Sequence, residues 1–400
     1  MIFFHLTLFR ARQIVSVLCL SLFAFHGLSA QSFSTGHTQR TFIDETRNNR
    51  EVAAEIYYPA NSAGENTPLA IDNGNRFPVI AFGHGFFMGW DSYEYLWNLL
   101  TSHGYIVAFP TTESGLSPSH EDFGKDLALV IADLKIEGQT STSFFFDVID
   151  STSCVMGHSM GGGAAHLAAS YDPSITAIAT LAAAETNPSA ISAAASITIP
   201  TLIFAGANDC ITPIPEHQQP IYDAFASSCK TMVTVTGASH CQFAGSNFAC
   251  SFGELTCSPA AAISAADQQA LVAEFLIPWL NNYLKYDCEQ GIVFQNLLQN
   301  QGISYQQNCT VCSSVRIDHV ADEFATISLE NNLIVIKSNL NQNLELRITD
   351  ISGKVVSAEV IEGKSGNEYA FNLSDYSGLY IISVSDGRHL TSIKKVINLN

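Results

Sequence analysis

The fold is decided by the stretch Val155-Met156-Gly157-His158-Ser159-Met160-Gly161-Gly162-Gly163. It contains the pattern Gly-x-Ser-x-Gly, preceded by an apolar run typical of a strand and followed by small residues typical of a helix. Glycine suits both flanking positions, because larger side chains would crowd the strained turn that projects Ser159. The helix that follows would favour negative charge beside the serine. We interpret Ser159 as a nucleophile; the alternative is a tight turn without chemistry.

Strand and helix signals alternate on both sides of this stretch, from Arg40 to about Tyr286. Such alternation predicts an α/β fold with a doubly wound, mainly parallel sheet, whose functional groups gather at the carboxyl ends of the strands. The expected strands are 51–58, 78–82, 105–109, 153–157, 175–181, 201–206 and 232–236, and the expected helices are 93–103, 123–134, 161–171 and 265–284.

The base and the acid that a serine nucleophile needs are expected at two further strand ends. His240 follows the strand 232–236, and Asp209 follows the strand 201–206. The order Ser159, Asp209, His240 is the one that this fold uses. Asp209 could instead be a turn residue and His240 a surface histidine, and Asp223 is the nearest rival acid, although it lies within a helical segment.

Two backbone amides are expected to hold the oxyanion, those of Met160 and Phe86. Phe86 ends the turn Gly83-His84-Gly85-Phe86 after the first core strand. His84 is interpreted as a structural partner of this turn rather than a proton carrier. Three other histidines are interpreted as surface or packing residues, namely His158, His166 and His217. No cofactor and no metal is needed for this chemistry.

The bulk composition supports a folded, exported protein. Of its 400 residues, 47% are hydrophobic and 14% charged, which favours a well-buried core. A net charge of −19 argues against nucleic acid as a partner. Residues 1–30 have the basic flank, apolar core and Leu28-Ser29-Ala30 cleavage site of a signal peptide; a membrane anchor is the alternative, for which the apolar run is short. We expect a monomer.

Cysteines are the next constraint, because exported chains form disulfides. Cys19 leaves with the signal peptide and nine cysteines remain, so at least one stays free. We expect this to be Cys154, in the strand before Ser159. Proximity suggests three pairs, although sequence does not fix connectivity: Cys210–Cys229, Cys250–Cys257, and Cys288 with Cys309 or Cys312. A zinc site is a rival reading of the late cysteines, but no four-ligand spacing with histidine appears.

The C-terminal part has a different pattern, with short strands separated by turn signals from about Ala321. It predicts a small all-β sandwich module over 323–400. Residues 291–322 are rich in Gln and Asn and are expected to be a linker, which leaves 31–290 as the catalytic domain. The expected strands are 327–329, 332–337, 344–349, 354–356, 369–371 and 379–384.

Three motifs, 157–163, 199–209 and 237–240, resemble the dienelactone hydrolase-like branch of the α/β-hydrolases, and within it the bacterial cutinase and polyester hydrolase group. The resemblance runs from about residue 50 to 245. It implies a serine ester hydrolase in which the residue at Phe86 also contacts substrate. That group carries a tryptophan on a loop that here reads Leu181–Asn187 and has no aromatic residue.

Other side chains could supply an apolar wall in its place, or could be ordinary packing: Phe87, Trp90, Phe243, Phe248 and Phe252. The segment Cys241–Pro259 reads as an insertion after His240, and we expect it to shape substrate access.

The C-terminal module resembles the sorting domain of the type IX secretion system of Bacteroidetes. The resemblance rests on Ile348–Val356, Leu379–Gly387 and the Lys394-Lys395 ending. It implies the secretion machinery as a partner and a secreted or cell-surface location. A small surface-binding β-module is the alternative.

The leading hypothesis is therefore a secreted carboxylic ester hydrolase that acts through an acyl-enzyme on small or polymeric esters, including polyesters such as poly(ethylene terephthalate). A peptidase or acyltransferase with the same triad, and a non-catalytic surface-binding protein on a hydrolase scaffold, are the alternatives.

Overall fold

The computed structural model describes residues 33–70 and 76–309 and, towards the C-terminus, strands and a few flanking positions between 325 and 398. The predicted signal peptide, Cys312 and most of the second half of the predicted linker lie outside the described residues. The strands of the first part are β1 (Ser34–Asp44), β2 (Arg50–Ala60), β3 (Gly64–Glu65), β4 (Phe77–Gly83), β5 (Ile106–Pro110), β6 (Ile149–His158), β7 (Ala177–Leu181), β8 (Thr201–Gly206), β9 (Cys229–Val235) and β10 (Ile303–Cys309). The α-helices are α1 (Glu94–Ser102), α2 (His120–Gln139), α3 (Met160–Tyr171), α4 (Ala190–Ala194), α5 (Gln218–Ala224), α6 (Phe248–Glu254), α7 (Ala265–Leu284) and α8 (Cys288–Leu297).

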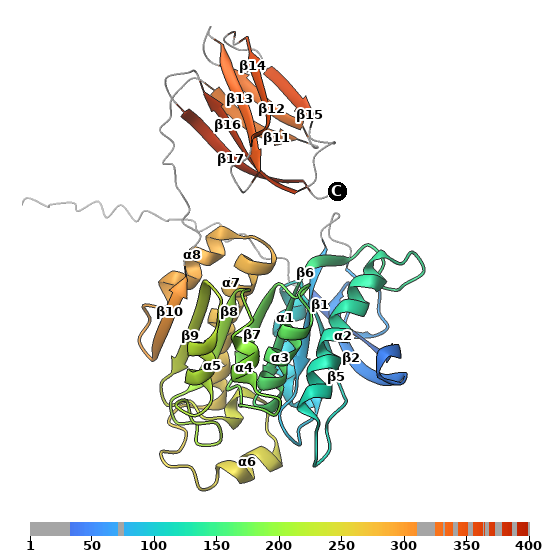
Figure 1. Ribbon diagram of the computed structural model, residues 1–400, viewed down its shortest axis with the longest axis vertical. Helices are drawn as coiled ribbons and strands as arrows, with labels where there is room; N and C mark the ends of the chain where they lie inside the picture. The colour runs from blue at the N-terminus through green and yellow to red at the C-terminus, as the bar shows by residue number, and fades with distance from the viewer. Residues whose placement is uncertain are drawn as a thin grey trace, which may run out of the picture.

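These strands form one ten-stranded sheet in the order β10-β9-β8-β7-β6-β4-β5-β2-β1-β3. Neighbouring strands from β5 to β9 run parallel, whereas β2 and β10 are antiparallel to the strands beside them. Figure 1 shows the sheet with helices on both sides. The predicted α/β class with a doubly wound, mainly parallel sheet is confirmed.

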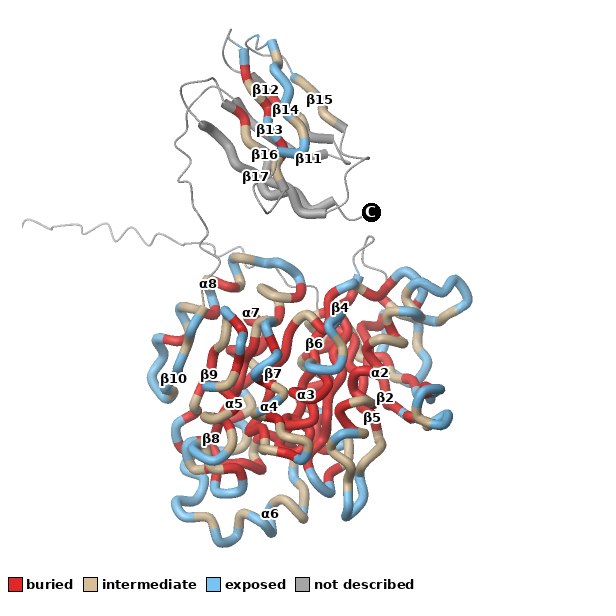
Figure 2. Tube along the Cα trace, in the orientation of Figure 1, coloured by how far each residue is buried: buried red, intermediate tan, exposed pale blue. Residues whose placement is uncertain are grey.

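Two hydrophobic cores lie on the two faces of the sheet, because successive strand residues point to opposite sides. Within β4, Val79 and Ala81 belong to the core that contains buried residues of α2, α3, α4 and α5. Ile80 and Phe82 belong to the other core, which contains residues of α1, α7 and α8. Figure 2 shows the central strands as buried along their length. Parallel strands covered on both faces read as continuous apolar runs, which is why the sequence revealed them.

The edges of the sheet differ most from expectation. The antiparallel strand β1 begins the fold and was not predicted. At the other edge, β10 pairs with β9 from Ile303↔Val235 to Cys309↔Cys229. Together with most of α8, it occupies part of the segment 291–322 that we expected to be a linker. Its side chains are mostly exposed, so it lacks the apolar run that marks a buried strand.

Two of the disulfide pairs suggested by proximity, Cys210–Cys229 and Cys250–Cys257, are wrong, whereas the suggested pair Cys288–Cys312 includes a residue outside the described ranges. The structure joins Cys210 to Cys257, Cys229 to Cys309 and Cys241 to Cys250. The first two pairs are 47 and 80 residues apart in sequence. Pairing of β9 with β10 places Cys229 beside Cys309, and the turn after β8 places Cys210 beside Cys257. Cys288 is also disulfide-bonded, but not to Cys309. Cys154 is free and buried, as expected.

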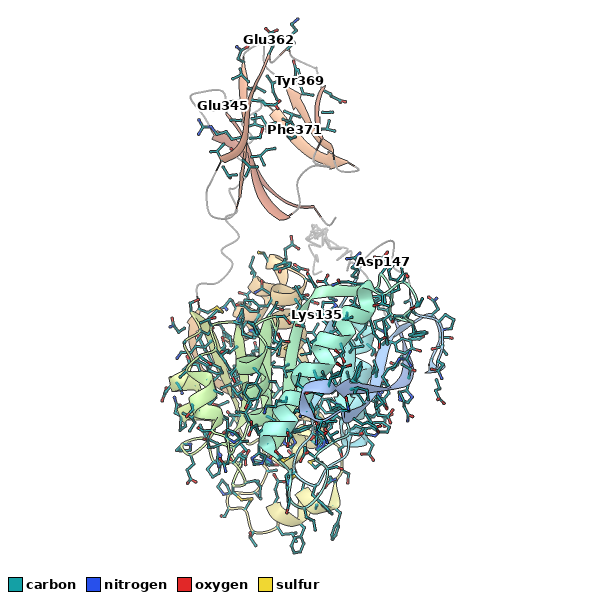
Figure 3. All side chains as sticks on the ribbon, turned by 45° about the vertical axis from the view of Figure 1, so that its right-hand side comes forward. Lys135, Asp147, Glu345, Glu362, Tyr369 and Phe371 are labelled. Carbon is teal, nitrogen blue, oxygen red and sulfur yellow. A yellow bond between two sulfur atoms is a disulfide. The ribbon has the colours of Figure 1, made fainter. Side chains whose placement is uncertain are left out.

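The C-terminal part contains two small antiparallel sheets, in the orders β11-β12-β15 and β14-β13-β16-β17. Their strands are β11 (Ala325–Glu330), β12 (Leu333–Ser338), β13 (Leu344–Asp350), β14 (Val355–Ile361), β15 (Glu368–Asn372), β16 (Gly378–Ser385) and β17 (Leu390–Asn398). The sequence revealed all of them except β17. Figure 3 labels Tyr369 and Phe371 on β15, and both side chains are only half-exposed. None of the helices in the described ranges has the length and hydrophobicity needed to cross a bilayer.

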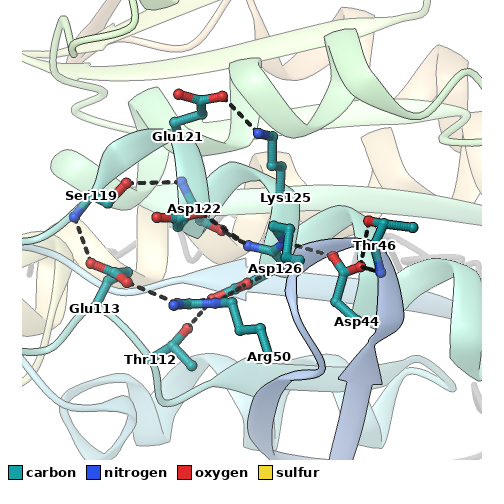
Figure 4. Close-up of polar contacts among 11 residues, drawn as sticks. Asp44, Thr46, Arg50, Thr112, Glu113, Ser119, Glu121, Asp122, Lys125 and Asp126 are labelled. Carbon is teal, nitrogen blue, oxygen red and sulfur yellow. Dashed lines mark hydrogen bonds and ion pairs between the residues drawn. The ribbon is translucent and has the colours of Figure 1, made fainter.

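A buried ionic cluster ties the start of the sheet to α2 (Figure 4). Asp126, whose side chain is fully buried, accepts hydrogen bonds from Arg47 at 2.6 Å and from Arg50 at 2.7 Å and 3.0 Å. The hydroxyl of Thr112 donates to the same carboxylate at 2.6 Å, and the carbonyl of Thr112 lies 2.9 Å from Nε2 of His84. The cluster therefore supports the loop after β4 through the loop after β5.

We expect Asp126→Ala to lower the free energy of unfolding by about 3–5 kcal/mol, because two arginines lose their shared buried partner. Glu121→Ala is the matched control on the same helix. Its ion pair with Lys125 is largely exposed, so its loss should change the free energy by less than about 0.5 kcal/mol. Urea unfolding measures both, and equal losses would contradict this account.

Candidate active site

Ser159 lies on the turn between β6 and α3. Its backbone has φ 55° and ψ −121°, a region that non-glycine residues rarely adopt. The turn packs very closely against its surroundings: a Cβ on Gly157 would lie 2.2 Å from the carbonyl oxygen of Gly161, and one on Gly161 would lie 2.1 Å from that of Gly83. Only glycine permits this approach. The strained conformation that the motif predicted for the serine is therefore present.

Asp209 and His240 lie beside each other at the ends of β8 and β9. Oδ2 of Asp209 is 2.8 Å from Nδ1 of His240, and both side chains are buried. Oδ1 of Asp209 accepts from the amides of Ile211 and Thr212, each at 2.8 Å, and the Thr212 hydroxyl donates to Oδ2 at 2.9 Å. The carboxylate is thus fixed by four hydrogen bonds, and it in turn orients the imidazole ring.

Ser159 and His240 line a pocket of about 260 Å³. Its other walls are apolar or small: Phe86, Phe87, Met88, Leu116, Ile211, and Ala249, Cys250 and Gly253 of α6. Met160 is the first residue of α3, where backbone amides have no partner within the helix. Phe86 borders the pocket from the loop after β4. The structure therefore brings all five predicted site residues to one end of the sheet.

His158 is the part of the site that sequence reasoning missed. It is completely buried, and its Nε2 lies 3.1 Å from the carbonyl oxygen of His240, to which it must donate. Nδ1 therefore accepts from the Tyr93 hydroxyl at 3.0 Å, and that hydroxyl accepts from the amide of Gly85 at 2.9 Å. One chain of hydrogen bonds thus joins the loop of Phe86, the turn of Ser159 and the loop of His240.

Burial determines the charge state of two histidines, His158 and His166. It lowers the pKa of His158 well below the usual value, and the nearby His240 adds to this effect. Burial also lowers the pKa of His166 to about 4. Both rings are thus neutral at physiological pH, which the single-donor pattern around His158 requires. His217 accepts a hydrogen bond from the amide of Glu185 at 2.9 Å.

No residue of the loop Leu181–Asn187 lines the pocket, whereas three residues of α6 do. Of the five aromatic residues considered, Phe87 alone lines the pocket. Phe243 is buried 6.3 Å from the ring of His158, and Trp90 packs against Trp97. Phe248 and Phe252 point to solvent from α6. The segment Cys241–Pro259 thus contributes to the pocket through the small residues of α6.

The arrangement suits nucleophilic chemistry. In the part of the chain that the structure describes, no three His, Cys, Asp or Glu side chains are grouped so as to hold a metal ion. An imidazole that is oriented by a carboxylate and shares a pocket with a serine can take the serine proton. Amides at a helix N-terminus can stabilise a negatively charged intermediate.

Comparison with known proteins gives two family matches. The PET hydrolase-like family model matches residues 37–290, more than half of the chain, and a secretion system C-terminal sorting domain matches residues 330–398. A sorting domain of this type indicates export to the cell surface or beyond.

Several curated proteins are similar to the first region. Cutinase est1 of Thermobifida alba is 28% identical over 186 residues, which is 46% of this chain and 56% of that protein. A bis(hydroxyethyl) terephthalate hydrolase of Streptomyces coelicolor is 28% identical over 187 residues, which is 46% of this chain and 54% of that protein. The chain therefore spans little more than half the length of these relatives.

The two buried neutral histidines predict a pH dependence of stability. His166 becomes protonated below about pH 6.5 in the unfolded chain, but only below about pH 4 in the folded protein. The free energy of unfolding should therefore fall as pH falls through this window, by up to about 1.4 kcal/mol per pH unit for each such histidine. The measurement is the free energy of unfolding, obtained from denaturant titrations at several pH values for wild type and for His166→Asn. This free energy should change less steeply with pH in the variant. The same dependence on pH in both proteins would contradict the assignment.

Proposed function

The chain belongs to the PET hydrolase-like family, and we propose that it is a serine ester hydrolase that cleaves carboxylic esters through an acyl-enzyme. One observation carries the proposal. His240 is hydrogen-bonded to the buried carboxylate of Asp209 at 2.8 Å and shares a pocket with Ser159. In a group of a buried carboxylate, an imidazole and a serine, the imidazole takes the hydroxyl proton while the carboxylate orients the ring and stabilises its charged form.

In the proposed reaction, Ser159 Oγ attacks the ester carbonyl while His240 takes its proton. Asp209 holds the ring with Nδ1 protonated, which leaves Nε2 free as the base, and stabilises the imidazolium that forms. His240 then protonates the leaving alcohol, and the acyl group remains on Ser159. Water activated by the same imidazole releases the acid and restores the serine.

The amides of Met160 and Phe86 are proposed to hold the oxyanion of both tetrahedral intermediates. Their effectiveness depends on rigid placement, since preorganised donors need no rearrangement as charge develops. Tyr93 and His158 supply part of this rigidity, because Tyr93 accepts the amide hydrogen of Gly85, the residue before Phe86. We assign Tyr93 and His158 as positioning residues.

The pocket favours uncharged substrates with an apolar acyl or alcohol part, because Phe86, Phe87, Leu116 and Ile211 surround Ser159. The names of the relatives, cutinase and bis(hydroxyethyl) terephthalate hydrolase, make polyesters and their fragments substrates to test. The type IX secretion machinery is the proposed partner of the C-terminal module. We further propose that residues 31–290, together with the rest of α8 and with β10, which belong to the same core and sheet, act as the catalytic unit and that the protein is a monomer.

Ser159→Ala should reduce hydrolysis of p-nitrophenyl esters by at least about 10³-fold, because the nucleophile is lost. Ser151→Ala, at an exposed position of the same strand, is the control and should keep wild-type activity. A Ser159→Ala variant as active as wild type would refute the mechanism. Parallel assays with a peptide amide and a polyester film decide between an ester hydrolase and a peptidase.

Tyr93→Phe should lower kcat by roughly tenfold and change KM little, because it leaves the Gly85 amide and Nδ1 of His158 without their buried partner. Tyr105→Phe is the matched control. Its buried hydroxyl donates to Asn281 at 2.7 Å at the amino end of β5, opposite the strand ends that carry the site, so its loss should affect stability but not kcat. Equal kcat values for the two variants would remove Tyr93 from the site.

A further inference from the structure

Helix α6 presents an apolar face to solvent beside the pocket. Ala249 and Gly253, one turn apart, line the pocket, and the adjacent stripe of Phe248 and Phe252 points outward. These two phenylalanines are 86% and 66% exposed, and their rings stack at 6.3 Å. Leu255, just after the helix, is 75% exposed. Figure 2 shows α6 as the exposed rim of this end of the domain.

The apolar surface continues from α6 across the mouth of the pocket. Phe86 and Phe87 are 50% and 49% exposed on the loop after β4, and Leu116 is 74% exposed. A Cβ placed on Gly253 would lie 3.4 Å from Ile211, which links α6 to the loop of Asp209. Single exposed apolar residues are ordinary, but a contiguous group around one opening marks a binding surface.

This surface is held in place rather than loosely folded. Two disulfides, Cys241–Cys250 and Cys210–Cys257, join α6 and the residues after it to the loops of His240 and Asp209. The carboxylate of Glu254 accepts from the amide of Cys241 at 2.7 Å and from the hydroxyl of Ser239 at 3.2 Å. The exposure of Phe248 and Phe252 is therefore built into the fold.

The surface is also uncharged on a strongly acidic protein. Between Cys241 and Ile263, Glu254 is the one charged residue, in a chain with a net charge of −19. The carboxylate of Glu254 is hydrogen-bonded to the loop of His240. A partner that complements this face is therefore apolar and uncharged, and it reaches the pocket mouth at the same time.

We propose that α6 and the pocket rim form an adsorption surface for a solid or aggregated, uncharged polyester. The phenylalanines bind repeat units on either side of the ester that enters the pocket, while the disulfides keep the face in register with Ser159. This inference rests on the proposed ester hydrolase function, but adsorption is measurable without hydrolysis.

The experiment measures adsorption of the full chain to dispersed poly(ethylene terephthalate) particles, in a Ser159→Ala background. Phe248→Ser with Phe252→Ser should raise the dissociation constant by at least about tenfold, since two large apolar side chains lose their burial. Ile136→Ser is the control, because Ile136 is 61% exposed on α2, away from the pocket. It should leave adsorption unchanged.

A second measurement separates this surface from the catalytic machinery. With Ser159 present, the double variant should hydrolyse soluble p-nitrophenyl acetate within about twofold of wild type, yet lose most of its activity on the particles. Adsorption that is independent of both phenylalanines, or tighter binding to neutral phosphatidylcholine vesicles than to the particles, would overturn the proposal. Phenylalanine-dependent adsorption by a chain that hydrolyses no ester would support the surface and refute the proposed function.

Discussion

The close approach of Gly157 and Gly161 at the end of β6 is the constraint on which the rest of the structure depends. It lets α3 begin directly behind a serine held at φ 55° and brings that helix against the backbone of Gly83 in β4. The loop after β4, which contains Phe86, is thereby placed beside Ser159. A side chain at Gly161 would push the backbone of Gly83 and His84, and with it the loop of Phe86, away from the turn of Ser159.

Hydrogen bonding around Ser159 turns this geometry into a rigid site. Four hydrogen bonds fix the Asp209 carboxylate, and the chain Gly85–Tyr93–His158–His240 joins three loops that come from distant parts of the sequence. The polar atoms that make these hydrogen bonds are buried and paired. This is the condition under which a buried hydrogen-bond network makes a site rigid instead of destabilising it. Helix α6, at the mouth of the pocket, is also held rigidly, because Glu254 and two disulfides attach it to the loops that carry His240 and Asp209.

The sequence was sufficient where the pattern is local. Ser159, Asp209 and His240 each follow a buried strand, and parallel strands bring such positions to one end of a sheet. It was insufficient where the outcome depends on packing between distant segments. The role of Tyr93 is invisible until α1 is packed on the sheet, and the partners of Cys210 and Cys229 are set by the positions of α6 and β10. Strand β10 itself was missed because an exposed edge strand needs no apolar run.

The central claim is that Ser159 is a nucleophile activated by His240. Stoichiometric labelling by a fluorophosphonate, followed by mass spectrometry of the peptides, tests it most directly. Our account predicts one adduct per chain, located on Ser159, and labelling slowed by orders of magnitude in His240→Ala. An adduct on another residue, or equally fast labelling of Ser159 in the variant, would contradict it.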